Sequence, residues 1–398
     1  MIDNFYNIKQ INSEIKKLHI PKEYWKINLE SFFNHDYTIL LSIRQDAGKT
    51  TMSLLLGLVI YKLYGFTTEY IRNDNAQITQ ANIETLYDVI LKFKYIEKLF
   101  PGKWNSVTYY FRRHKFHLCL RDKDGNIIEE DLNPLCCVHS NENCENAKSG
   151  YNNPVGNFII YDEVFDSKQP SMKLWTELMN NISTIGRVED PERANKVHVL
   201  MLGNNSNQYG WLFDDFCISD LVPQLTFGKV IDVKTAMGTT LTCSLLEQSE
   251  RHKEYLKRNN IHFFGFNTKK AAQFIGQTEW AGKDYQHIDF DLEPENLRFK
   301  RMYIRHRGRY IQLNYYTDEE RKDYVFAHFS NAPLFDDNVI LCLDPKTKQE
   351  FYGLCDYENN KKVYEMVRTL FRFRAENRWY YENNYIGELI DDFIKNIS

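Results

Sequence analysis

A short polar loop between two apolar segments constrains this chain more than any other feature. The run Thr38–Ile43 is typical of a strand buried in a parallel sheet. An apolar helix is predicted from about Lys49 to Tyr64, closed by Gly65. Between them, Gly48-Lys49-Thr50 supplies a glycine, a cation and a hydroxyl at a helix N-terminus, which is the arrangement of a phosphate-binding loop.

In such a loop, backbone N–H groups hold the phosphates, the lysine neutralises their charge, and the hydroxyl ligates Mg²⁺. The predicted ATP-binding residues are Arg44, Gln45, Asp46, Ala47, Gly48, Lys49, Thr50 and Thr51. The pattern departs at Ile43, where a glycine is expected five residues before Gly48. The alternative is a helix N-terminus with an exposed lysine and no nucleotide.

A second apolar strand ends in two carboxylates. Phe158–Tyr161 is followed directly by Asp162 and Glu163. Asp162 is the predicted Mg²⁺ ligand together with Thr50, and Glu163 is the predicted catalytic base that polarises the attacking water. The adjacent glutamate favours an ATP-hydrolysing motor over a small-molecule kinase. Taken alone, the pattern also fits a strand that ends in a solvated acidic turn.

Three further polar residues are candidates for catalysis. A strand over Val197–Leu202 leads to Asn204, whose amide fits a sensor of the γ-phosphate, although an ordinary turn is the alternative. Lys148 precedes the acidic strand and Arg187 precedes the sensor strand. Cations there can reach a neighbouring subunit's nucleotide. From the sequence alone, a solvated side chain is the simpler interpretation of both.

Strand and helix alternate through the first part of the chain, which predicts an α/β domain with a mainly parallel sheet. After about residue 222 the pattern becomes mixed α/β. The expected domains are 1–220, a linker over 221–245, and a smaller domain over 246–398. The other expected elements are a helix over 76–99, a hairpin over 106–130 that turns at Asp124-Gly125, a helix over 170–183, short strands over 222–245, a charged helix over 246–259, strands over 296–355, and helices over 361–374 and 383–396.

The charge balance limits any nucleic-acid surface to a local patch. Net charge is −4, so neither a basic arm nor an acidic tail is expected. The best candidate patch contains no acidic residue and comprises Arg298, Lys300, Arg301, Arg305, Arg307 and Arg309. It would suit phosphate-backbone contacts to double-stranded DNA or to a structural packaging RNA; a solvated strand face is the alternative. Mean hydropathy of −0.54 and the lack of a long apolar run predict no membrane partner.

Several of these motifs together resemble viral DNA-packaging ATPases. Arg44-Gln45 before Gly48-Lys49-Thr50 looks like the arginine-containing loop of terminase large subunits, and Tyr70–Arg72 looks like the family's second strand. Length and motif order are more similar to the encapsidation ATPases of phi-29-like tailed bacteriophages. Arg44 lies four residues before Gly48, one farther than is usual in the family, which leaves its role open between cis and trans.

The resemblance implies a P-loop NTPase of the ASCE type that uses ATP and Mg²⁺. It also implies a homo-oligomeric ring, a pentamer in the family, that sits on the capsid portal and drives double-stranded DNA into a preformed procapsid. Such a motor acts in the host cytoplasm and is absent from the mature virion. Lys148 and Arg187 would act in trans, and the C-terminal domain would be an RNase H-like nuclease that has lost its catalysis.

Three rival functions remain. A terminase with a working nuclease needs about three convergent carboxylates, whereas residues 299–315 are basic and aromatic. A helicase-like ATPase outside packaging lacks the expected motifs after the sensor strand. A non-enzymatic scaffold would explain Ile43 but has little need of Glu163 beside Asp162.

Overall fold

The computed structural model describes two compact units. The first comprises Met1–Gln208 with Asp215–Ala281, and the second comprises Tyr209–Asp214 with Gly282–Ser398. The residues that it describes are 6–20, 25, 27–42, 48–141, 156–165, 171–185, 197–204, 211–219, 221–222, 225–226, 228–235, 238–246, 302–317, 323–330, 339–342, 365, 368–369 and 372–395.

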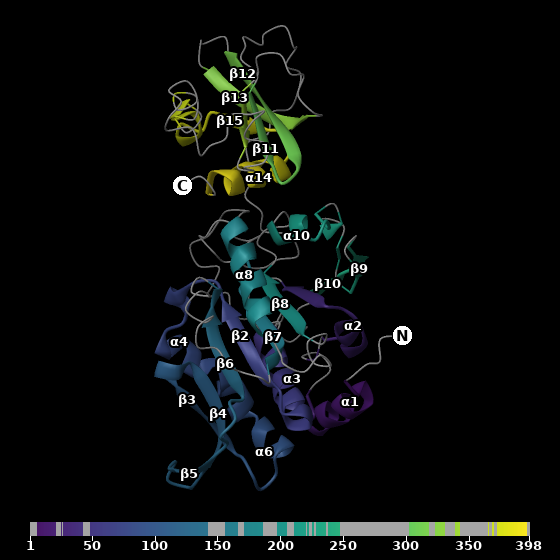
Figure 1. Ribbon diagram of the computed structural model, residues 1–398, viewed down its shortest axis with the longest axis vertical. Coiled ribbons are helices and arrows are strands. Elements are labelled where there is room, and N and C mark those ends of the chain that lie inside the picture. Colours follow the sequence, from purple (N-terminus) through teal and green to yellow (C-terminus); the bar gives the residue numbers. More distant parts are fainter. Residues whose placement is uncertain are drawn as a thin grey trace, which may run out of the picture. The chain divides into compact units, whose positions relative to one another are not determined.

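The first unit is built on one large mixed sheet (Figure 1). Its strands are β1 (Tyr37–Ser42), β2 (Thr67–Arg72), β3 (Ser106–Tyr110), β4 (Lys115–Arg121), β5 (Ile127–Glu130), β6 (Cys136–Ser140), β7 (Gly156–Asp162), β8 (His198–Asn204), β9 (Val230–Lys234) and β10 (Thr240–Leu246). Its helices include α1 (Ile8–Lys17), α2 (Leu29–Asn34), α3 (Lys49–Tyr64), α4 (Gln80–Glu84), α5 (Asp88–Lys92), α6 (Tyr95–Leu99) and α8 (Ser171–Ile185), and α10 (Trp211–Asp215) follows in the chain.

The strand order is β3-β4-β6-β2-β7-β8-β1-β10-β9. The six strands from β6 to β10 in that order run parallel. The outer strands β3, β4, β5 and β9 join in antiparallel fashion. The predicted α/β domain with a mainly parallel sheet is confirmed. Because the strands are parallel, the ends of β1, β7 and β8 that carry or lead to the predicted site residues meet at one edge, together with the end of β2.

The predicted apolar helix is α3, and its buried position explains why it has no polar face. Every residue from Met52 to Tyr61 is buried, because α3 lies against the sheet and is covered by other helices. The helix ends where predicted, at Gly65, whose φ of 69° suits a glycine cap. Gly57 lies so close to β2 that a Cβ there would stand 2.2 Å from Thr68 Oγ1.

Two predicted elements are more broken than expected. The segment 76–99 is not one helix, because Thr79 caps a new start and Lys94 adopts a left-handed φ of 55° between α5 and α6. The segment 106–130 makes three strands. The turn at Gly125 is present, and a second reversal occurs at His114, whose φ is 50°. The sequence hid that reversal because no glycine or asparagine marks it.

The predicted linker 221–245 is wrong where it contains two strands of the large sheet. Thr240–Leu246 is β10, which pairs in parallel with β1 from Tyr37 to Ser42. Val230–Lys234 is β9, which pairs with β10. The predicted short strands of this region therefore complete the large sheet instead of leading away from it.

The second unit has a smaller sheet and its own core. Its elements are β11 (Met302–His306), β12 (Arg309–Thr317), β13 (Asp323–Ser330), β14 (Val339–Cys342), β15 (Trp379–Tyr381) and α14 (Asn384–Lys395), and the strand order is β14-β11-β12-β13-β15. Met302, Ile304, Leu313 and Ile390 belong to one buried cluster. A smaller mixed domain is thus confirmed, and α14 matches the last predicted helix. The predicted helix over 246–259 lies outside the described residues except for Leu246, which ends β10, and most of 361–374 also lies outside them.

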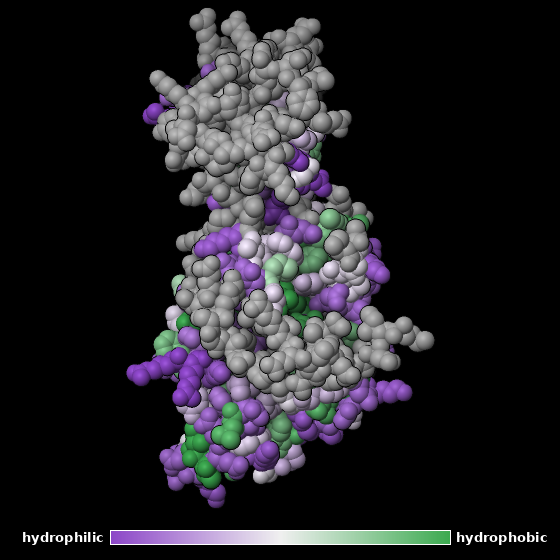
Figure 2. Space-filling model, viewed as in Figure 1, coloured by the Kyte–Doolittle hydropathy of each residue, from purple (hydrophilic) through white to green (hydrophobic). Residues whose placement is uncertain are grey.

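The surface of the first unit carries an apolar patch over β5 (Figure 2). Ile128 is 64% exposed and Leu132 is 93% exposed. Among the described helices, none is both long enough and apolar enough to cross a bilayer.

We expect Gly57→Ala to destabilise the first unit by about 1–3 kcal/mol, because its methyl group would overlap Thr68 Oγ1. Urea unfolding measures the effect. The double variant with Thr68→Ala should recover part of the loss, because it removes the overlapping atom. A double variant that is no more stable than Gly57→Ala would contradict this account of the close contact.

His198 predicts a loss of stability at mildly acidic pH. Burial lowers the pKa of His198 from 6.5, although a hydrogen bond to the His35 carbonyl oxygen acts in the opposite direction. The unfolded chain therefore binds a proton below about pH 6.5 that the folded chain does not, so stability falls as pH falls. His198→Asn keeps a donor and does not titrate. Its Tm should fall less than the wild-type Tm between about pH 7.5 and about pH 5.5; equal slopes would contradict the assignment.

Candidate nucleotide-binding and catalytic site

The start of α3 has the features of an anion site. Gly48 is its N-cap with a φ of 70°, and no side chain caps the helix there. The first N–H groups of a helix have no partners within it and carry partial positive charge. Lys49 Nζ donates to Ser42 Oγ, which places the ammonium group at the end of β1.

Asp162, at the end of β7, is the centre of the site. Its side chain is 6% exposed. Oδ2 accepts from Thr50 Oγ1 at 2.8 Å and from Tyr70 OH at 2.7 Å, and Oδ1 accepts from the Glu163 N–H at 2.9 Å. The Arg72 guanidinium lies 3.9 Å from Oδ2. A buried carboxylate is tolerated only when it is paired and hydrogen-bonded, and both conditions hold here.

Tyr70 is a neutral donor to that carboxylate. Burial raises the pKa of Tyr70 well above 10, and the negative charge of Asp162 raises it further. The hydroxyl also accepts a hydrogen bond from Arg72 Nε at 3.0 Å. Tyr70 therefore links Arg72 to Asp162 through two hydrogen bonds and carries no charge itself.

Glu163 is held in one orientation by two neighbours. Arg72 Nη1 donates to Oε2 at 2.9 Å, and Gln77 Nε2 donates to the same oxygen at 3.2 Å. The carbonyl oxygen of Glu163 accepts from Asn73 Nδ2 at 2.8 Å. Its φ of 56° is rare for a residue with a Cβ. The side chain is 33% exposed, so solvent can reach it.

The donor set fits Mg²⁺ and a nucleotide phosphate. Thr50 Oγ1 and Asp162 Oδ2 are hard oxygen ligands within 2.8 Å of each other. Lys49 and the uncapped start of α3 are next in the chain and supply positive charge for phosphate oxygens. Thr50 and Asp162 would hold the ion, and Gly48 and Lys49 would hold the phosphates.

The other predicted site residues are placed only in part. Asn204 is the last residue of β8 and stands opposite Ser42 of β1 in the sheet register, so its backbone lies at the same edge as the site. Outside the described residues lie Arg44, Gln45, Asp46, Ala47, Lys148, Arg187, Arg298, Lys300 and Arg301.

Sequence reasoning missed three of the residues that surround the carboxylates. Tyr70 and Arg72 come from β2, and Gln77 from the turn after it. Their contact with Asp162 and Glu163 depends on β2 lying beside β7. The sequence marked Tyr70–Arg72 only as resembling the family's second strand, and the local pattern adds that Tyr70 and Arg72 point to the same face of a strand. Neither signal names the neighbouring strand.

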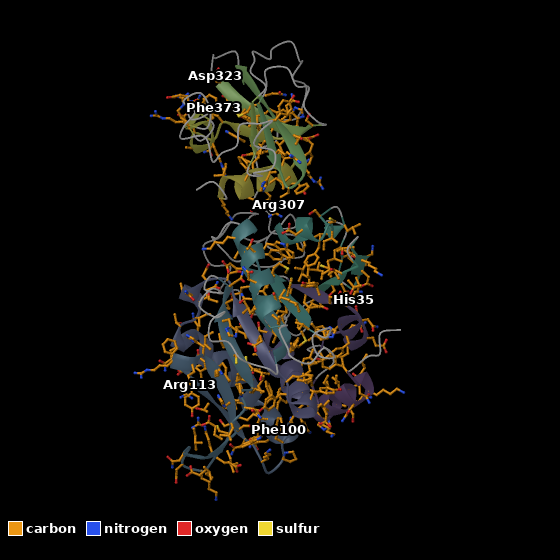
Figure 3. The ribbon with its side chains drawn as sticks, viewed as in Figure 1. His35, Phe100, Arg113, Arg307, Asp323 and Phe373 are labelled. Carbon is orange, nitrogen blue, oxygen red and sulfur yellow. The ribbon has the colours of Figure 1, made fainter. Side chains whose placement is uncertain are left out.

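The described part of the predicted basic patch is largely engaged within the second unit. Arg307 lies beside α14 (Figure 3), where its Nε donates to Asp392 Oδ2 at 3.0 Å and its side chain is 11% exposed. The Arg309 guanidinium lies 4.9 Å from the ring centroid of Tyr385. Arg305 lies 5.7 Å from the ring centroid of Tyr310. Arg307 thus forms an ion pair with Asp392 of α14 within this unit.

The arrangement defines a class of protein. The strand β8 lies between β1, which leads to α3, and β7, which ends at Asp162 just before Glu163. This inserted strand, together with the glutamate directly after the strand-end aspartate, identifies the fold as that of an ASCE-type P-loop NTPase.

Within that class, the fold is that of phage DNA-packaging motors. The chain is similar to the solved Phi-28 gp11 DNA packaging motor, at 14% identity and a TM-score of 0.56, over 95% of this chain and 99% of that one. It is also similar to the bacteriophage Phi-29 viral genome packaging motor assembly, at 12% identity and a TM-score of 0.52, over 94% and 100%. No family model and no curated protein sequence matches the chain. The resemblance read from the motifs is thus confirmed at the level of the fold.

We expect Tyr70→Phe to lower the free energy of unfolding by about 1–3 kcal/mol, because it leaves Asp162 and Arg72 with unmade hydrogen bonds in a buried site. Tyr110→Phe is a matched control, since Tyr110 OH also donates to a carboxylate, that of Glu130, but at an exposed position. It should cost less than about 0.5 kcal/mol. Equal losses by chemical denaturation would show that burial does not set the strength of the Asp162 contact.

Proposed function

We propose that this protein hydrolyses ATP with Mg²⁺ and uses the energy to translocate double-stranded DNA. The observation that carries the proposal is the 2.8 Å contact between Thr50 Oγ1 and Asp162 Oδ2, with Glu163 directly after Asp162. A hydroxyl at a helix N-terminus beside a strand-end carboxylate is the arrangement that holds Mg²⁺ on a nucleotide.

Each residue has a distinct task in this mechanism. Lys49 and the start of α3 bind the β- and γ-phosphates, and Thr50 and Asp162 hold the ion. Mg²⁺ supplies charge neutralisation on the phosphate oxygens when it is bound. Glu163 orients the attacking water and accepts its proton. Arg72 and Gln77 set the direction of the Glu163 carboxylate, and Asn204 would report the loss of the γ-phosphate.

The likeness to two packaging-motor structures supports a role in viral genome packaging. In this proposal the chain forms a homo-oligomeric ring on the capsid portal and acts in the host cytoplasm on a preformed procapsid. Lys148 and Arg187 act in trans on a neighbouring subunit's nucleotide, and Arg44 contributes at the phosphates. A structural packaging RNA is a further candidate partner.

The second unit is proposed to be a vestigial nuclease domain that contacts DNA. Its central strands β11 and β12 contain no aspartate or glutamate. Across the part of the chain that the structure describes, no cluster of three His, Cys, Asp or Glu side chains is arranged to hold a metal ion. With Arg307 paired to Asp392, the DNA-contacting role falls to Arg298, Lys300, Arg301, Arg305 and Arg309.

The test is steady-state ATP hydrolysis with and without double-stranded DNA. Glu163→Gln should lower kcat by about 100-fold to 10,000-fold while ATP still binds, because it removes the general base and leaves the phosphate and metal ligands in place. Glu97→Gln is a matched control, since Glu97 is exposed on α6 and pairs only with Lys94 in the described contacts. Its rate should equal that of wild type.

Three outcomes would contradict the proposal. Failure of the wild-type protein to bind ATP would rule out the proposed nucleotide site. Hydrolysis that persists in Glu163→Gln would rule out Glu163 as the general base. Metal-dependent cleavage of the added DNA would favour a terminase with an active nuclease.

A further inference from the structure

Four buried polar side chains form a hydrogen-bonded chain on the sheet face that α8 covers. Asn73 follows β2, Asn141 follows β6, Tyr161 lies in β7 and Asn181 lies in α8. None of them is more than 5% exposed. The surrounding interior is mostly apolar and buried, and includes Ile71, Ile159, Leu174, Leu178, Val199 and Met201. The same face also carries a separate polar pair, in which His139 Nε2 lies 2.7 Å from Glu69 Oε2.

The hydrogen-bonded chain of side chains begins at the backbone of Glu163. Asn73 Nδ2 donates to the Glu163 carbonyl oxygen at 2.8 Å, and Tyr161 OH donates to Asn73 Oδ1. Ser140 Oγ donates to the Asn73 carbonyl oxygen at 3.3 Å, which fixes the backbone at the end of β2. Asn73 is therefore held from two sides where it contacts Glu163.

The other end of this hydrogen-bonded chain lies on α8. Asn141 Nδ2 donates to Tyr161 OH at 3.3 Å and to the Leu174 carbonyl oxygen at 3.0 Å. Asn181 Nδ2 donates to Asn141 Oδ1 at 3.0 Å. Asn141 thus meets the helix at two points, about two turns apart, so that the helix is fixed in both position and rotation.

The placement of polar groups in this interior argues for a positional role. Apolar residues alone would pack α8 on the sheet, whereas buried amides and hydroxyls are unfavourable unless every member is paired. A paired network permits one arrangement of its parts. Such a fixed arrangement matters most at Glu163, because its left-handed φ of 56° is unusual for a residue with a side chain.

We propose that Asn73, Tyr161, Asn141 and Asn181 are positioning residues that couple the backbone of Glu163 to helix α8. The proposal rests on the proposed function, in which Glu163 is the base for ATP hydrolysis. Helix α8 ends at Ile185, two residues before Arg187 in the sequence. The network therefore sets the orientation of the base and of the helix that leads to the trans-acting candidate together.

The first test is Tyr161→Phe in the full-length chain, which removes a hydroxyl and leaves no large cavity. We expect kcat for ATP hydrolysis to fall about tenfold and KM for ATP to stay within about twofold, because the phosphate and metal ligands are untouched. Tyr87→Phe is the matched control. Tyr87 is equally buried and its hydroxyl contacts the Cys136 thiol, away from the site.

The second test changes Asn181, at the end of the hydrogen-bonded chain that lies farthest from Glu163. Asn181→Leu keeps the approximate size of the side chain, and Asn181 reaches Glu163 only through Asn141, Tyr161 and Asn73 among the contacts described above. It should lower kcat about threefold or more. The double variant with Tyr161→Phe should be no slower than the slower single variant, because both break one path. Losses that multiply, or a kcat equal to that of Tyr87→Phe, would overturn the coupling.

Hydrogen–deuterium exchange tests the same link without turnover. In Asn181→Leu, exchange should rise in the peptide that spans Asp162–Phe165, where the Val164 N–H bonds to the Leu202 carbonyl oxygen. It should not rise there in Tyr87→Phe. Unchanged exchange in Asn181→Leu overturns the proposal even if wild-type protein hydrolyses ATP. A wild-type protein that fails to hydrolyse ATP contradicts the proposed function, while the exchange result still decides the link.

Discussion

The Asp162 carboxylate is the contact on which the rest of the site depends. It lies where α3, β2 and β7 converge, and it accepts hydrogen bonds from Thr50, Tyr70 and the Glu163 backbone. Removing a carboxylate from water is costly, and only a full set of partners offsets that cost. The partners must therefore stay in place, so the same carboxylate fixes the start of α3 and the turn at Glu163 relative to each other.

Neighbouring residues of β7 serve opposite faces of the sheet. Asp162 points to the face that α3 covers, where it meets Thr50. Tyr161, one residue earlier, points to the face that α8 covers, where it joins the buried amides. Because side chains alternate along a strand, two adjacent positions suffice to place both the proposed metal ligand and a link to α8 at one strand end. Glu163 follows both and is held by partners from each side.

The sequence predicted what depends on local pattern. The apolar runs located β1, α3, β7 and β8, and Gly65 marked the end of α3, because burial and glycine caps leave direct signals. What depends on strand order was not predictable. Arg72 reaches Glu163 only because β2 lies beside β7, and β10 was taken for a linker because nothing local says that it pairs with β1. The breaks at Lys94 and His114 were hidden because neither residue type usually adopts a positive φ.

The pairing of β10 with β1 has a consequence for how the chain is made. The two strands are separated by about two hundred residues, so their contact closes a long loop, which is slow to form. Until Thr240–Leu246 has left the ribosome, β1 remains an edge strand with an apolar sequence, and such edges invite pairing with other chains. A fragment that stops near residue 220 would keep that edge permanently. Synthesis must therefore proceed well past Asn204 before β10 covers the edge of β1, the strand that leads to the proposed nucleotide site.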